Sequence, residues 1–220
     1  MFLVWRAVKE NKLLAASGTG LALALALIAL LSSRFQDGAG GTFGEALPFV
    51  GLLMGAGAAY LVLLKAIPSS AGRSTLLLTC LLIGAAFRLI FFGSTPIYED
   101  DWRRYLWDGA VSAAGISPYS YAPADAALAD PLGRPLGAAE NPDIETLQRL
   151  GAADDRWPEL INYPYLTTIY PPLAQLAFYA AHTIAPFNLD AWRLVLLVAD
   201  VATLVLLLKL LAAWGRDPLW

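Results

Sequence analysis

Long apolar runs separated by short polar segments form the main pattern along this chain. Residues 13–31, 46–64 and 75–92 make three runs in the first half, and residues 169–186 and 192–213 make two in the second half. A helix needs about 20 mostly apolar residues to cross the hydrocarbon core of a bilayer. The pattern therefore predicts an all-α polytopic membrane protein with about five transmembrane helices.

A long polar segment, residues 94–168, separates the third apolar run from the fourth. It holds 12 of the 18 acidic residues but only five of the 15 basic residues. Within it, residues 100–114 place apolar side chains at helical spacing, while Asp101, Arg104 and Asp108 share another face. Such a segment is typical of a helix that lies in the plane of the membrane interface.

The remainder of the polar segment gives weaker signals. Residues 122–151 are rich in Ala, Pro, Gly and Asp and are predicted to be irregular, whereas residues 154–160 favour one helical turn. The expected architecture is thus a set of membrane helices joined by one long loop that carries interfacial helices.

The basic residues that flank the first two apolar runs predict the orientation of the chain in the membrane. They are Arg6, Lys9, Lys12, Lys65 and Arg73. Because short cytoplasmic segments are enriched in Lys and Arg, the N-terminus is expected in the cytoplasm, and three crossings then place residues 94–168 outside. With five crossings, Lys209 and Arg216 would fall outside, against the same rule.

Composition narrows the class of protein further. The chain is 58% hydrophobic and only 15% charged, with a mean hydropathy of +0.56, whereas a soluble domain is about a quarter charged. The single cysteine and single histidine exclude a disulfide framework and a His or Cys metal cluster. We expect a multi-pass protein of the plasma (inner) membrane, with the lipid bilayer and no nucleic acid as a partner.

Three consecutive acids, Glu99, Asp100 and Asp101, are the main candidates for chemistry. A carboxylate fixed at the membrane surface can act as the general base that activates an acceptor hydroxyl. The three could instead hold a divalent cation that carries phosphate oxygens. A purely structural interpretation has Asp100 pairing with Arg104 across one helical turn, with the acids solvating the start of the helix.

Three arginines are candidates for binding a phosphate. Arg103 and Arg104 could clamp it bidentately, or could extend to lipid headgroups. Arg88 lies inside the third apolar run, where a charge is costly, so it is expected to bind a substrate phosphate or to anchor the loop. Aromatic side chains could stack on sugar rings or form an interfacial belt; they are Trp102, Trp107, Tyr119, Tyr121, Tyr163, Tyr165 and Tyr170.

The order of several motifs resembles the polytopic GT-C glycosyltransferases. An arginine late in an apolar run is followed by E-D-D-W-R-R-Y-L-W-D-G, then G-I-S-P-Y, then I-Y-P-P-L-A-Q-L and A-W-R-L-V-L-L-V-A-D. The likeness is greatest to bacterial mannosyltransferase-like members that use polyprenyl-phosphate sugars. It covers roughly residues 75–220, so residues 1–74 would be two additional N-terminal membrane helices.

The resemblance implies an inverting transfer of a sugar, such as mannose, to a glycan or lipid acceptor on the non-cytoplasmic face. Asp100 or Asp101 would be the base, and the substrate-binding residues would be Arg88, Glu99, Arg103, Arg104, Tyr105, Tyr119 and Tyr170. That superfamily has more membrane helices than this sequence, so the chain is expected to be an N-terminal portion that is inactive alone. The alternative is a non-enzymatic membrane protein, either half of a transporter or an assembly scaffold.

Overall fold

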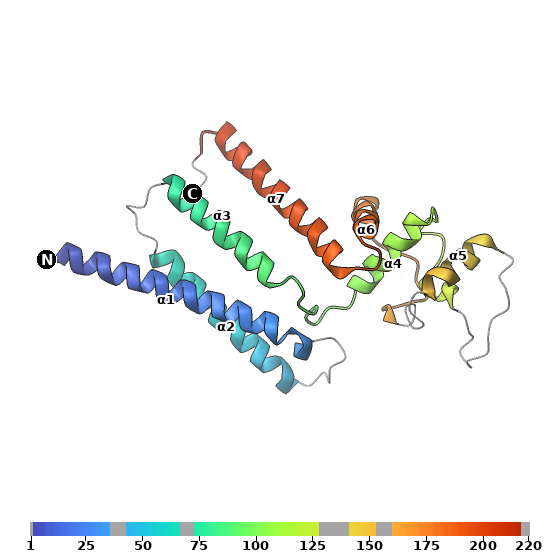
Figure 1. Cartoon of the computed structure of the whole chain (residues 1–220), viewed down its shortest axis with the longest axis horizontal. Helices are drawn as coiled ribbons and strands as arrows, with labels where there is room; N and C mark the ends of the chain where they lie inside the picture. The colour runs from blue at the N-terminus through green and yellow to red at the C-terminus, as the bar shows by residue number, and fades with distance from the viewer. Residues whose placement is uncertain (1, 36–42, 67–72, 128–140, 153–159, 217–220) are drawn as a thin grey trace. The chain divides into compact units, whose positions relative to one another are not determined.

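The computed structural model covers the whole chain, and we describe all of it except residues 1, 36–42, 67–72, 128–140, 153–159 and 217–220. In the described residues, all regular secondary structure is helical (Figure 1). The prediction of an all-α protein is therefore confirmed.

Three helices are long and apolar enough to cross a membrane. They are α1 (Phe2–Leu30), α2 (Phe43–Ala66) and α7 (Leu189–Ala213), and each coincides with an apolar run of the sequence. The third run forms α3 (Arg73–Ile90), whose 18 residues lie at the lower limit of about 17 for a spanning helix. The fourth run forms α6 (Pro172–Ile184), which has only 13 residues. The structure thus supports a helical membrane protein, while the predicted count of five spans remains a prediction.

The chain divides into two compact units. The first comprises Met1–Tyr98 and Thr203–Trp220, and the second comprises Glu99–Ala202. In the first unit α1 packs along α2, and Phe35, in the short 3-10 helix η1 (Ser32–Phe35), lies 5.3 Å from the ring of Phe49. The backbone N–H of Tyr98 donates to the carbonyl of Phe35 at 2.7 Å, so the segment after α3 is fixed to the end of η1.

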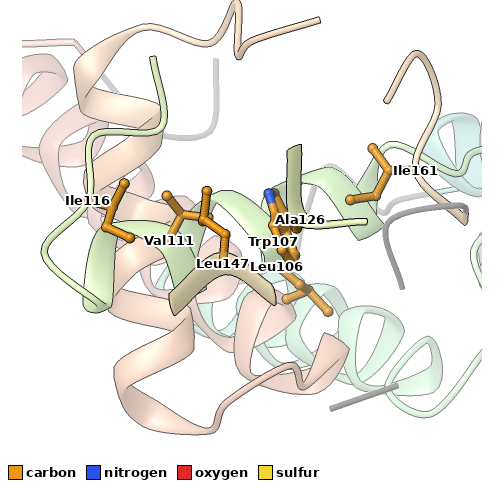
Figure 2. Close-up of a cluster of buried hydrophobic side chains, with 7 residues drawn as sticks. All are labelled: Leu106, Trp107, Val111, Ile116, Ala126, Leu147 and Ile161. Carbon is orange, nitrogen blue, oxygen red and sulfur yellow. The ribbon is translucent and has the colours of Figure 1, made fainter. Parts of the chain in front are cut away.

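The second unit is built on the packing of α4 (Trp102–Ala113) against α6. Gly109 permits this close approach, because a Cβ there would lie 2.8 Å from the carbonyl carbon of Phe178 and would overlap its oxygen. A hydrophobic cluster fills the other side of α4 (Figure 2). Its members are Leu106, Trp107, Val111, Ile116, Ala126, Leu147 and Ile161.

This packing corrects the expectation that the apolar face of residues 100–114 is turned to the membrane interface. Every residue of α4 from Leu106 to Val111 is buried, and Trp107 is only 2% exposed. The helix is therefore the centre of its unit, and Trp107 belongs to a core and not to an interfacial belt. An amphipathic pattern identifies an apolar face but does not say whether lipid or protein covers it.

The expectation that residues 122–151 are irregular is wrong at its C-terminal end, where α5 (Pro142–Gly151) forms. The side chain of Asn141 caps this helix by accepting from the N–H of Asp143 at 2.9 Å, and Pro142 takes the first helical position, where its missing N–H is harmless. A short 3-10 helix, η2 (Pro123–Ala126), packs against α5. Most of the turn expected at residues 154–160 lies outside the described residues.

Candidate functional site

The three consecutive acids lie at the N-terminal end of α4, and two of them have different partners. The hydroxyl of Tyr170 donates to Oδ2 of Asp101 at 3.1 Å, and the side-chain amide of Asn162 donates to Oδ1 of Asp100. Asp101 is the N-cap residue of α4, yet its side chain makes no capping hydrogen bond. Its carboxylate is therefore held by a neutral donor from a distant segment and not by its own helix.

The acids do not form the cation site that the sequence left open. Among the described residues, no three His, Cys, Asp or Glu side chains are grouped in a way that could hold a metal ion. Asp100 and Asp101 instead use carboxylate oxygens as acceptors for Asn162 and Tyr170. The geometry thus gives no support to a divalent cation bound by Glu99, Asp100 and Asp101.

Glu99 differs electrostatically from its two neighbours. Partial burial raises the pKa of its carboxyl group above the ordinary value of 4.5, and the charges of Asp101 and Asp100 raise it further. Much of the side chain nevertheless remains exposed. A carboxyl group with a raised pKa beside two other carboxylates keeps its proton to higher pH than an isolated glutamate does.

A group of aromatic rings supports the phenol that holds Asp101. The ring of Tyr105 stacks on Phe178 with centroids 4.8 Å apart and meets Tyr170 edge-on at 5.2 Å, while Trp192 from α7 lies 5.5 Å from Tyr105. Burial raises the pKa of Tyr170, and the neighbouring Tyr105 and the charge of Asp101 add to the effect. Tyr170 is therefore protonated at neutral pH and available as a donor.

Arg104 takes part in a buried polar network. Its Nε donates to Oδ1 of Asp108 at 2.8 Å, one turn along α4, and the two side chains are only 8% and 2% exposed. From α6, Nε2 of Gln175 donates both to Oδ2 of Asp108 and to the hydroxyl of Thr168, each at 2.9 Å. The network joins the two helices across their interface.

The same network extends to the segment before α6, because Nη1 of Arg104 donates to the carbonyl of Leu166 at 2.9 Å. The sequence placed Arg104 either on a phosphate or opposite Asp100, but in the structure its ion-pair partner is Asp108. Nη2 of Arg104 and Oε1 of Gln175 are buried with no hydrogen-bond partner in the described part of the chain. A buried guanidinium that is already paired with Asp108 is a poor candidate for binding a substrate phosphate.

The remaining candidates are distributed over both units. Arg103 is half-buried, with its guanidinium carbon 4.9 Å above the ring of Trp102. The hydroxyl of Tyr119 donates to the carbonyl of Tyr170 at 2.6 Å, so Tyr119 supports the same loop. Arg88 lies in the first unit, where its Nη1 donates to the carbonyl of Gly84 in its own helix. The structure therefore brings Asp101, Tyr105, Tyr119 and Tyr170 together.

Comparison with protein-family models, with curated proteins and with solved structures found no match to this chain.

Three functional candidates escaped the sequence analysis: Asn162, Thr168 and Gln175. Gln175 carries a usable signal, because an amide side chain within the apolar segment L-A-Q-L-A must find a partner when it is buried. Asn162 and Thr168 lie in a polar stretch, where an amide or a hydroxyl is ordinary and predicts nothing.

Proposed function

We propose that this chain is part of an integral membrane glycosyltransferase, with Asp101 as the general base. One observation carries the proposal. The Asp101 carboxylate is oriented by the protonated hydroxyl of Tyr170, forms no ion pair among the described residues, and makes no capping bond to its own helix. A carboxylate with unused lone pairs, held by a neutral donor, can accept a proton from an acceptor hydroxyl.

The proposed reaction is inverting. Asp101 removes the proton from the acceptor hydroxyl, and the resulting oxygen attacks the anomeric carbon of a sugar carried on a polyprenyl phosphate. The bond from that carbon to the phosphate oxygen breaks on the opposite face, and the lipid phosphate leaves with the electron pair. The acceptor, a glycan or a lipid, retains the sugar, and Asp101 retains the proton until solvent removes it.

Arg103 is the preferred cation for the departing lipid phosphate. Its guanidinium carbon lies 4.9 Å over the ring of Trp102, and a guanidinium in such a contact can still donate hydrogen bonds to an anion. Arg104 is not assigned this role, because Asp108 already neutralises it. Tyr105 and Glu99 are proposed to line the sugar site, whereas Arg88 belongs to the first unit and is not assigned to this site.

The side of the membrane expected for residues 94–168 supports the choice of a lipid-linked donor. The basic residues around the first two apolar runs favour a cytoplasmic N-terminus, and three crossings would then put residues 94–168 on the non-cytoplasmic face of the plasma membrane. A polyprenyl-phosphate sugar can present its headgroup on that face. The GT-C-like motifs of residues 75–220 favour the same donor class.

The test is transfer of a radiolabelled hexose from polyprenyl phosphate in membranes that contain the protein as its cell makes it. Asp101→Asn should lower the rate about 100-fold or more, the usual contribution of a general base, without loss of protein from the membrane. Glu145→Gln, which neutralises an exposed acid on α5, is the matched control and should leave the rate unchanged. Asp100→Asn separates the two candidate bases.

Full activity in both Asp variants would refute the site. If neutralising every charge at residues 99–104 also left the cellular role of the protein intact, a non-enzymatic transporter half or scaffold would replace the enzyme.

A further inference from the structure

The helix α6 is too short to cross a membrane. Its 13 residues rise about 20 Å at 1.5 Å per residue, whereas the hydrocarbon core is about 30 Å thick. It begins directly after Pro171, which is its N-cap, and it ends before Ala185, whose backbone is extended. The apolar run of residues 169–186 is long enough to span, but the helix formed from it is not.

The two faces of α6 have different surroundings. Gln175, Phe178 and Ala181 are buried on the side that packs on α4. The opposite side exposes large apolar residues, namely Leu173 (78% exposed), Leu176 (61%), Tyr179 (43%) and Ile184 (55%). No Asp, Glu, Lys or Arg occurs in the helix, and the Thr183 hydroxyl donates to the carbonyl of Tyr179 at 2.9 Å. Apart from the phenol hydroxyl of Tyr179, the outer face therefore presents hydrocarbon and an internally bonded hydroxyl.

The segment before α6 also exposes large hydrophobic side chains. Its exposed large hydrophobic residues are Tyr163 (75%), Tyr165 (81%), Leu166 (57%) and Ile169 (84%). Tyrosines are enriched where a membrane meets water, because the ring can be immersed while the hydroxyl stays hydrated. Two exposed tyrosines followed by exposed aliphatic residues are the order expected of a chain that meets the surface of a bilayer.

The short connection from α6 to α7 bears on how α6 lies relative to the membrane. Only four residues separate Ile184 from Leu189, and α7 is one of the helices long enough to span. Two spanning helices joined by so short a loop would pack side by side as antiparallel neighbours. Within the second unit, Figure 1 instead shows α6 nearly along its own axis and the first part of α7 from the side, so the chain turns sharply between them. If α7 crosses the bilayer, α6 lies along its surface.

We propose that α6 lies in the plane of the membrane interface and does not cross. Its outer row of Leu173, Leu176, Tyr179 and Ile184 would be immersed in the acyl chains of the leaflet that faces residues 94–168. The helix α4 would then lie on the aqueous side of α6, about one helix diameter of 10 Å from the hydrocarbon. The chain would re-enter the membrane only at α7.

This placement also accounts for the basic residues that contradict five crossings. With α6 removed from the count, α7 starts on the same side as residues 94–168 and ends on the opposite side. Lys209 and Arg216 are then cytoplasmic, as the enrichment of Lys and Arg in short cytoplasmic segments requires. The ion pair between Asp190 and Arg193, 2.7 Å long, lies at the outer end of α7, at headgroup level.

The decisive measurement is whether residues 94–168 and the end of α7 are on the same side of the membrane. In a Cys80→Ser background, Glu145→Cys and Trp214→Cys each introduce one exposed thiol, which is labelled with a membrane-impermeant maleimide in intact and in permeabilised cells. We expect labelling of Glu145→Cys from outside and of Trp214→Cys only after permeabilisation. Labelling of both from the same side means that α6 crosses and overturns the proposal.

A spin label at Leu176→Cys tests the occupant of the outer face. Contact with acyl chains predicts strong relaxation by oxygen and weak relaxation by a water-soluble nickel complex, opposite to a label at Glu145→Cys. Equal nickel accessibility at the two sites, or a Leu176 label protected from both reagents by protein, would refute the lipid contact. Neither measurement uses a sugar donor, so this proposal and the proposed glycosyl transfer succeed or fail separately.

Discussion

The buried pair of Arg104 and Asp108 makes the strongest quantitative prediction about stability. Asp108→Asn keeps the shape of the side chain but removes its charge. The amide can still accept one hydrogen bond, yet it must turn its NH2 group toward Nε of Arg104 or toward Nε2 of Gln175, both of which are donors. One of the two contacts therefore becomes repulsive, and a guanidinium whose side chain is only 8% exposed loses its counter-charge.

Removing one member of a buried ion pair costs about 3–5 kcal/mol, because the other charge stays buried without compensation. We expect Asp108→Asn to lower the free energy of unfolding by that amount, and Arg104→Met by a similar amount. The double variant should lose clearly less than the sum, because no charge is then left alone. The assay is reversible unfolding of the full chain in mixed micelles, followed by tryptophan fluorescence.

An exposed ion pair in the same chain provides the control. Asp190 and Arg193 are 2.7 Å apart, but Asp190 is 52% exposed, so Asp190→Asn should cost less than about 1 kcal/mol. If Asp108→Asn stays within about 0.5 kcal/mol of the unmodified protein, as an ordinary surface change does, the network is not structural and the reasoning fails. Arg104 would then become a candidate for binding substrate again.

Two further predictions concern the packing of α4 and the acids beside it. Gly109→Ala should destabilise the second unit by about 1–3 kcal/mol in the same unfolding assay, because its methyl group overlaps the Phe178 carbonyl. Gly51→Ala, which meets nothing within 4 Å, should cost nothing, and equal effects of the two changes would disprove the close approach. The pKa of Glu99 is raised in the folded protein, which therefore keeps a proton that the unfolded chain loses above pH 4.5. The free energy of unfolding should consequently fall as the pH rises from 4.5 to the raised pKa of Glu99. Glu99→Gln should remove this fall, and an unchanged pH profile would show that Glu99 is not perturbed.

Local sequence determined most of the helices. The apolar runs of residues 13–31, 46–64 and 192–213 became α1, α2 and α7, because the length and apolar character of a run are properties of the chain alone. The helix α4 was also predicted, within two residues at its start. The α5 helix was missed although Asn141 and Pro142 are a recognisable cap and first position.

Burial could be decided only by the tertiary structure. The spacing of Arg104 and Asp108 places them on one helical face, but whether water, lipid or protein covers that face depends on Gln175 and Thr168, at least 60 residues further along the chain. The contact between Tyr170 and Asp101 likewise joins residues separated by 69 positions. No local pattern encodes such a pair.

The contrast is clearest at α6. The sequence offers an apolar run of spanning length at residues 169–186, whereas the structure forms a helix of 13 residues, one face of which is occupied by α4. Hydropathy sums the preference of each residue for an apolar environment and does not distinguish a protein neighbour from a lipid neighbour. The sequence by itself therefore determined where apolar helices form, and the packing of α4 on α6 decided which of their faces remain for the membrane.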